Sequence, residues 1–318
     1  RLRASTVAVI QGPSFNPCTK EKRMRSILGS MVVSSLALAQ VDGGAAKAEA
    51  KPVAAPTAKV VQSIEGFSTP ESVLYDAETD TYLVSNINGS PVAKDNNGFI
   101  SEVSADGKIL TLKFIEGGQK KVTLNAPKGL ALSKGSLYVA DIDTVRWFDR
   151  KTGAPQGSLP ILGSTFVNDL TVAADGTIYL SDSGLKGTKD GLGPTGTDGV
   201  YAIETGKKPK LRTVKKSKDL HGPNGVLAID GTVLVVPFGG DELFTLDGKV
   251  KDAAAPVHTG AKGLDGLIKV GNELIFSSWD SKALWHGPAA GPFVQLLGDL
   301  EAPADIGFDS KRNRVLVP

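Results

Sequence analysis

The sequence predicts an all-β protein, a six-bladed β-propeller, from three observations. One signature recurs: a polar residue behind a Pro or apolar residue, a strand-like apolar run, a Gly or Asp turn, and a second run. The polar residues follow one another at spacings of 57, 40, 56, 41 and 40 residues, and such repeats of short strands are typical of propellers. No stretch after Lys59 keeps a helical period. The residues in register are Glu71, Lys128, Asn168, Asn224, Asp265 and Asp305.

Each repeat contains short runs rich in Val, Ile, Leu and Tyr, closed by Asp-Gly or Gly-Asn turns, which are typical of antiparallel strands. In chain order the expected strands are 72–76, 81–85 and 98–103; 129–132, 136–140 and 144–149; 170–173, 177–181 and 199–203; 225–229, 232–236 and 242–246; and 267–270, 273–277 and 283–286. The sixth blade has only 305–309 and 314–318, with 59–64 as an outer strand. We therefore expect it to be incomplete at the C-terminus, because a closed ring leaves no open edge.

Two spacings exceed 40 residues because the first and third blades carry insertions. These are Asn86–Asn97 and Ser183–Asp198, both rich in Gly, Asn, Lys and Thr. Long loops on a rigid scaffold commonly carry function, and a solvated loop without a task is the alternative.

The region before the propeller has the pattern of a secretory signal. A basic cluster at 20–25 precedes an apolar run that ends in Ala37-Leu38-Ala39. This order predicts a signal peptide that begins at Met24 and is cleaved after Ala39. We therefore divide the chain into upstream residues and signal peptide at 1–39, a flexible linker at 40–58, and the propeller at 59–318. The expected location is periplasmic or secreted.

Removal of that leader changes the chemistry available to the chain. The first 39 residues hold six Lys or Arg and one Glu, so the remainder is net negative and gives no reason to expect nucleic acid. No membrane contact is expected after cleavage. The single cysteine, Cys18, lies in the leader, so the remainder offers no disulfide, thiol nucleophile or Cys-ligated metal.

The polar register predicts a metal site on the propeller axis. A lone Asn or Asp at a turn is normally a turn residue, but here Glu71, Asn168, Asn224 and Asp265 recur at one structural position. Oxygen ligands from carboxylates and amides suit a hard cation: Ca²⁺ is the expected ion, with Mg²⁺ or Mn²⁺ as alternatives. Lys128 cannot bind a metal, and would hold an anionic substrate group or pair with a carboxylate.

These residues carry a resemblance to a known family. From about Gly66 onward the chain resembles the senescence marker protein / gluconolactonase / luciferin-regenerating enzyme family of six-bladed propellers. The matching stretches are Pro70-Glu71-Ser72-Val73, Phe166-Val167-Asn168-Asp169, Pro223-Asn224-Gly225 and Leu264-Asp265-Gly266. The resemblance implies that Glu71, Asn168, Asn224 and Asp265 surround a divalent metal at the channel mouth, and that Asp265 serves as base or nucleophile.

The expected function is metal-dependent hydrolysis of a lactone or related ester, a small-molecule substrate. Lys128 and Asn86 would orient the substrate. His221, three residues before Asn224, would accept a proton from the attacking water, or is simply a loop histidine. The alternative function is a non-catalytic propeller that binds a ligand or partner protein and uses its metal to fix the blades. The sequence leaves the oligomeric state open.

Overall fold

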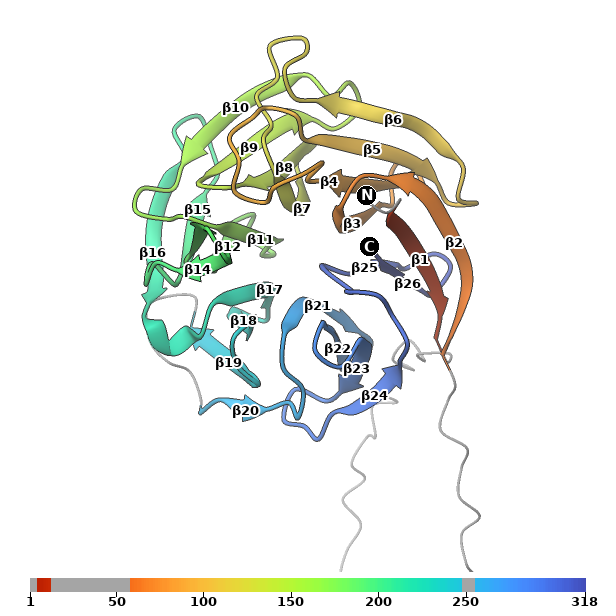
Figure 1. Cartoon of the computed structure of the whole chain (residues 1–318), viewed down its shortest axis with the longest axis vertical. Coiled ribbons are helices and arrows are strands. Elements are labelled where there is room, and N and C mark those ends of the chain that lie inside the picture. The colour runs from red at the N-terminus through yellow and green to blue at the C-terminus, as the bar shows by residue number, and fades with distance from the viewer. Residues whose placement is uncertain (1–4, 13–57, 248–254) are drawn as a thin grey trace, which may run out of the picture.

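The computed structural model describes residues 5–12, 58–247 and 255–318. It confirms the predicted all-β fold: six four-stranded antiparallel sheets are arranged as blades around one axis (Figure 1). Within these residues, the only helix is the 3₁₀ turn η1 (Lys218–Leu220). None of the described segments forms a helix long and apolar enough to cross a membrane.

The first five blades follow the chain order, with the innermost strand first. Blade 1 contains β3 (Pro70–Asp76), β4 (Thr81–Asn86), β5 (Phe99–Ser104) and β6 (Ile109–Glu116), and blade 2 contains β7 (Pro127–Ser133), β8 (Ser136–Asp141), β9 (Thr144–Asp149) and β10 (Pro155–Pro160). Blade 3 contains β11 (Val167–Val172), β12 (Ile178–Asp182), β15 (Gly199–Glu204) and β16 (Lys210–Lys216). Blade 4 contains β17 (Pro223–Ile229), β18 (Thr232–Pro237), β19 (Glu242–Asp247) and β20 (Val257–His258), and blade 5 contains β21 (Leu264–Val270), β22 (Glu273–Ser278), β23 (Ala283–Gly287) and β24 (Val294–Leu297).

Blade 6 is complete, which corrects the prediction of an incomplete blade. Its strands from the axis outward are β25 (Gly307–Asp309), β26 (Arg314–Val317), β1 (Ser5–Gln11) and β2 (Lys59–Phe67). Strand β1 pairs with β26 from Ala8↔Val317 to Gln11↔Arg314, so a segment near the N-terminus supplies the missing strand. Residues 5–11 therefore belong to the propeller, contrary to the predicted boundary at 59.

The rest of the predicted leader and linker lies outside the described residues, including Met24 and the cleavage site after Ala39. Within the predicted linker, Ala58 is described, and it is buried in the cluster between blades 5 and 6. The periplasmic or secreted location stays a prediction. The predicted cleavage after Ala39 conflicts with the fold, because it would cut β1 from the chain that forms the rest of blade 6.

The core consists of apolar clusters between neighbouring blades. Between blades 1 and 2, for example, Leu83 and Ile100 pack with Leu137 and Phe148. The closing interface uses Val7 and Val9 of β1 in the same way, together with residues of β3 and β4. Because the inner strands are largely buried between neighbouring blades, they are held rigidly around the axis.

Candidate active site on the propeller axis

The predicted polar residues occupy one equivalent position in the fold. Glu71, Lys128, Asn168, Asn224 and Asp265 are each the second residue of an innermost strand, at β3, β7, β11, β17 and β21. In all five blades the pairing register breaks directly after the first residue of that strand. Such a break leaves two residues outside the regular ladder and re-aims their side chains.

Serine hydroxyls on the second strands satisfy the backbone at these breaks. Ser85 Oγ accepts the N–H of Ser72 at 2.9 Å, Ser181 Oγ that of Asp169 at 3.0 Å, and Ser277 Oγ that of Gly266 at 2.8 Å. Ser181 Oγ donates in turn to the carbonyl of Asn224 in the next blade, at 2.6 Å, and Ser277 Oγ to that of Ala304, at 2.7 Å. These hydroxyls link neighbouring blades at the level of the polar register.

Asp305 joins the same group from blade 6, two residues ahead of β25. Its backbone N–H donates to the carbonyl of Glu71 at 2.9 Å, and its carboxylate accepts the hydroxyl of Ser72. The neighbouring Asp169, which was not among the predicted site residues, accepts the N–H of Val226 at 2.7 Å. Its only sequence signal is that it replaces the Gly found after Lys128, Asn224 and Asp265.

The axial carboxylates are buried and act on one another electrostatically. Burial first, and then the charges of Asp265 and Asp305, raise the pKa of Glu71 well above its ordinary value. Burial and the charge of Asp305 raise the pKa of Asp265 to about 8, and burial raises the pKa of Asp305 to about 7. Burial lowers the pKa of Lys128 to about 8, against the attraction of Glu71. Glu71 thus interacts electrostatically with Asp265, Asp305 and Lys128.

Three of the four predicted metal ligands present a buried oxygen that lacks a hydrogen-bond partner. These atoms are Glu71 Oε2, Asn168 Oδ1 and Asp265 Oδ1. A buried polar atom without a partner is costly, and unpaired oxygens on separate strands are what a cation would satisfy. The donor set, which contains oxygen alone, fits a hard divalent ion.

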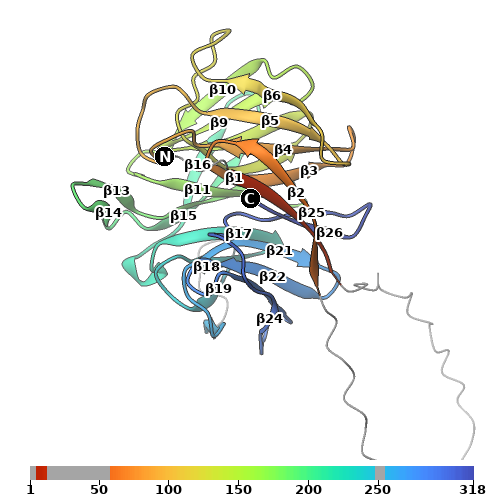
Figure 2. The same ribbon diagram turned by 45° about the vertical axis from the view of Figure 1, so that its right-hand side comes forward.

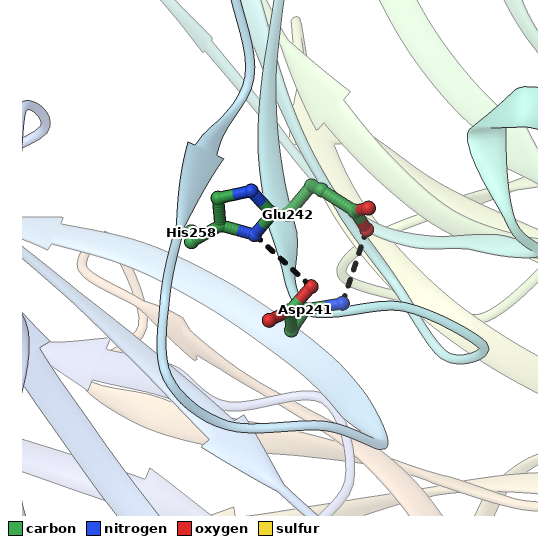
Figure 3. A group of neighbouring side chains, drawn as sticks. All are labelled: Asp241, Glu242 and His258. Atoms are coloured by element: carbon green, nitrogen blue, oxygen red, sulfur yellow. Dashed lines mark hydrogen bonds and ion pairs between the residues drawn. The ribbon is translucent and has the colours of Figure 1, made fainter.

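A second ionisable group lies away from the axis, at the outer part of blade 4 (Figure 3). Among the described residues, Asp241, Glu242 and His258 are the one set of three His or carboxylate side chains with ligand atoms all within 4.8 Å of one another. His258 Nδ1 lies 3.2 Å from Asp241 Oδ1, and the Asp241 N–H donates to Glu242 Oε2 at 3.0 Å. These three side chains already interact with one another, unlike the unpartnered oxygens of Glu71, Asn168 and Asp265.

His221 lies beside that outer group. Its Nδ1 is 3.4 Å from Glu242 Oε2, and its ring packs edge-on against Phe244. It also lines a pocket of about 510 Å³ between blades 3 and 4, together with Ser183 and Phe238. The predicted contact between His221 and substrate stays a prediction.

The Lys128 ammonium group is held by two hydrogen bonds and one aromatic ring. Its Nζ donates to the carbonyls of Pro91 and Ala126, both at 3.1 Å, and lies 4.4 Å from the centre of the Phe166 ring. Pro91 belongs to the blade 1 insertion, so Lys128 fastens that loop at the mouth of the channel. The predicted contact between Lys128 and substrate stays a prediction.

Asn86 is bonded inside blade 1, and its predicted contact with substrate stays a prediction. The residue is 0% exposed. Its Oδ1 accepts the N–H of Ser68 at 2.9 Å, and its Nδ2 donates to Val84 O at 3.0 Å and to Ser101 Oγ at 3.1 Å. Because its polar atoms are bonded inside blade 1, Asn86 fixes the start of the insertion.

The two insertions meet on the side of blades 1 to 3. Lys94 of the first insertion pairs with Asp143 of blade 2 at 2.5 Å. The second insertion forms the hairpin β13 (Leu185–Thr188) and β14 (Gly191–Pro194), which projects from the ring in Figure 2. A Cβ atom at Gly187 of this hairpin would lie only 3.2 Å from Val92 of the first insertion.

Comparisons with known proteins support the fold. No protein-family model matches the chain, and no curated protein matches it in sequence. A gluconolactonase from Xanthomonas campestris matches with a TM-score of 0.57 and 17% identity, over 79% of this chain and 86% of the other. A propeller in a nidogen/laminin complex matches with a TM-score of 0.58 and 15% identity, over 81% and 88%.

A virginiamycin B lyase from Staphylococcus aureus is similar as well, with a TM-score of 0.54 and 10% identity, over 80% of this chain and 84% of the other. At these identities the likeness concerns architecture, and the same architecture serves enzymes and binding proteins alike. The expected resemblance is thereby confirmed in the fold: this chain shares the six-bladed propeller of the gluconolactonases.

Proposed function

We propose that this protein is a divalent-metal-dependent hydrolase of lactones or related esters, with its site at the axial mouth. The observation that carries the proposal is the set of unpartnered buried oxygens on Glu71, Asn168 and Asp265. Those residues, with Asn224, are the ones that the family resemblance assigns to a metal. Ca²⁺ is the proposed ion, with Mg²⁺ or Mn²⁺ as alternatives.

A cation held by Glu71, Asn168, Asn224 and Asp265 would polarise the carbonyl of a bound ester and stabilise the charge that develops on its oxygen. The chain supplies the rest. Asp265 presents a carboxylate oxygen free of hydrogen bonds, which can take a proton from water or attack the carbonyl itself. The Ser183 hydroxyl holds the Asn168 amide, since it accepts from Asn168 Nδ2 at 3.0 Å and leaves the buried Oδ1 free for a cation.

The test is hydrolysis of a panel of lactones by the whole protein, with each divalent ion added after chelation. We expect turnover to disappear with chelator and to return with Ca²⁺ or Mn²⁺. Asp265→Asn should lower kcat/KM at least about 100-fold, the usual minimum for loss of a general base. Asp230→Asn, the same change at an exposed turn residue, is the matched control and should retain activity.

The same samples distinguish the non-catalytic alternative, which the nidogen propeller keeps open. Calcium at 100 times its Kd should stabilise the folded protein by about 2.7 kcal/mol if it binds only that state. A chelator that lowers Tm without any lactone being hydrolysed would support a structural metal in a binding propeller. If Ca²⁺, Mg²⁺ and Mn²⁺ change neither Tm nor activity, the metal site itself is rejected.

A further inference from the structure

One ring of equivalent residues borders the axial site, directly after the second strand of each blade. In blades 1 to 5 these residues are Ile87, Ile142, Ser183, Phe238 and Trp279. Four of them are fixed by the same backbone bond, from their own N–H to a carbonyl just before the inner strand. These bonds are Ile87 to Thr69, Ser183 to Phe166, Phe238 to Gly222 and Trp279 to Gly263, at 2.8–3.0 Å.

The members of this ring differ sharply in exposure. Ile87, Ile142 and Ser183 are 6%, 5% and 2% exposed, whereas Phe238 and Trp279 are 38% and 40% exposed. The two isoleucines pack with Ala126 under the first insertion, which Lys128 holds in place. The ring residues are therefore buried in blades 1 and 2, whereas blades 4 and 5 present exposed aromatic side chains at the mouth.

The two exposed aromatic rings form one surface. Their centres lie 5.7 Å apart with planes at 77°, an edge-to-face contact that fixes both rings. Trp279 follows Ser278, the partner of Leu264 in the β21–β22 pair, so its ring lies beside Asp265 and interacts with that carboxyl group. An aromatic pair left half exposed beside a buried carboxylate is unusual for a surface without a ligand.

Phe238 also joins this surface to the pocket of about 510 Å³, a volume within the range of small-molecule sites. Ser183 lines the same pocket and accepts a hydrogen bond from Asn168 Nδ2, so one residue of the pocket wall contacts a predicted metal ligand. The rest of the wall is mixed: Leu185 and Pro194 are apolar, whereas Thr195, Asp198, Lys218 and His221 carry polar or charged side chains. The apolar contact surface beside the axial site is therefore supplied mainly by the exposed rings of Phe238 and Trp279.

We propose, on the basis of the hydrolase function above, that the substrate carries a flat aromatic or alkyl group which packs on Phe238 and Trp279. This places aryl-fused or alkyl-substituted lactones and aryl esters ahead of sugar lactones. The aromatic pair holds the apolar end of the substrate in the pocket between blades 3 and 4, and the ester carbonyl reaches the axial oxygens of Asn168 and Asp265.

The experiment compares dihydrocoumarin with glucono-δ-lactone as substrates of the holoprotein. We expect kcat/KM for dihydrocoumarin to be at least about 10-fold higher. Phe238→Ala should lower that ratio at least about 10-fold. Trp279→Phe, which keeps an aromatic ring, should retain most of it. Leu162→Ala, which truncates an 84% exposed apolar side chain in blade 2, is the matched control and should leave the ratio unchanged.

A binding measurement separates this inference from the hydrolase proposal. The lactam analogue of dihydrocoumarin, 3,4-dihydro-2-quinolinone, is titrated calorimetrically into each variant, with Tm recorded to confirm folding. Binding that weakens at least about 10-fold in Phe238→Ala, but not in Leu162→Ala, supports the aromatic surface even if no lactone is hydrolysed. Equal turnover of both lactones, or a Phe238→Ala variant that binds the lactam as tightly as wild type, overturns it and leaves the hydrolase proposal standing.

Discussion

Gly225 tests whether the close approach of inner strands shapes the axial site. A Cβ atom at this position would lie 2.2 Å from the carbonyl oxygen of Asp265 and 3.0 Å from the N of Leu267. Ordinary contact begins at 3.4 Å, so blades 4 and 5 would have to separate by about 1 Å. Both opposing atoms are backbone, which cannot rotate away as a side chain can.

We therefore expect Gly225→Ala to cost about 3 kcal/mol, the upper end of the usual range for overpacking. For a domain of this size each kcal/mol shifts Tm by about 2–4 °C, so Tm should fall by about 6–12 °C. The assay is calorimetric unfolding at a fixed scan rate, with and without Ca²⁺. The displaced carbonyl belongs to Asp265, so the stabilisation by Ca²⁺ should also shrink.

Gly206→Ala is the matched control, because nothing lies within 4 Å of a Cβ atom there and its φ suits alanine. Its Tm should be unchanged or slightly higher, as expected for a compatible Gly→Ala change. If Gly225→Ala has the same Tm as Gly206→Ala, the contact between blades 4 and 5 does not require a glycine. That result would refute our reasoning about the site.

Three further predictions concern the polar links that hold the ring. Asp141→Ala should lower the free energy of unfolding by about 3–5 kcal/mol in urea, because the fully buried carboxylate pairs with a guanidinium and accepts two backbone N–H groups. Tyr82→Phe should cost about 1.5–3 kcal/mol, since the hydroxyl donates to Asp309 in blade 6 at 2.7 Å; an unchanged urea midpoint would argue against that bond. Asp80 pairs with Arg312 through two bonds of 2.8 Å, which hold its pKa below the ordinary 3.8. The stability that comes from a lowered pKa is present above pH 3.8 and is lost as the pH falls through the pKa of the folded state. The difference in urea midpoint between wild type and Asp80→Asn should therefore shrink from about pH 5 to about pH 2. A difference that stays constant over this range would contradict the ion pair.

The sequence was sufficient for the architecture and for most of the axial register. Each inner strand begins with the same local pattern, so equivalence in the sequence became equivalence in space for Glu71, Lys128, Asn168, Asn224 and Asp265. The serines that link the blades were not predicted, because a serine within a strand looks the same whether or not it bonds to the next blade.

Other features depend on partners that are distant in the chain. The sequence alone does not reveal strand β1, because its partners, Arg314–Val317, lie some three hundred residues away and leave no local trace. Asn86 follows a strand, as a loop ligand would, but its amide turns inward to Ser101 in the adjacent strand. The sequence does not predict the solvent exposure of Phe238 and Trp279 either, since that exposure depends on where the insertions of other blades lie.

The pairing of β1 with β26 also has a consequence for biosynthesis. Strand β1 precedes every other strand of the propeller in the chain and β26 follows them all, so the ring can close only after β26 has been translated. Until then the growing chain exposes unpaired strand edges, a state prone to aggregation. Asp305, bonded to Glu71 across the closing seam, joins the other axial carboxylates only at that final step.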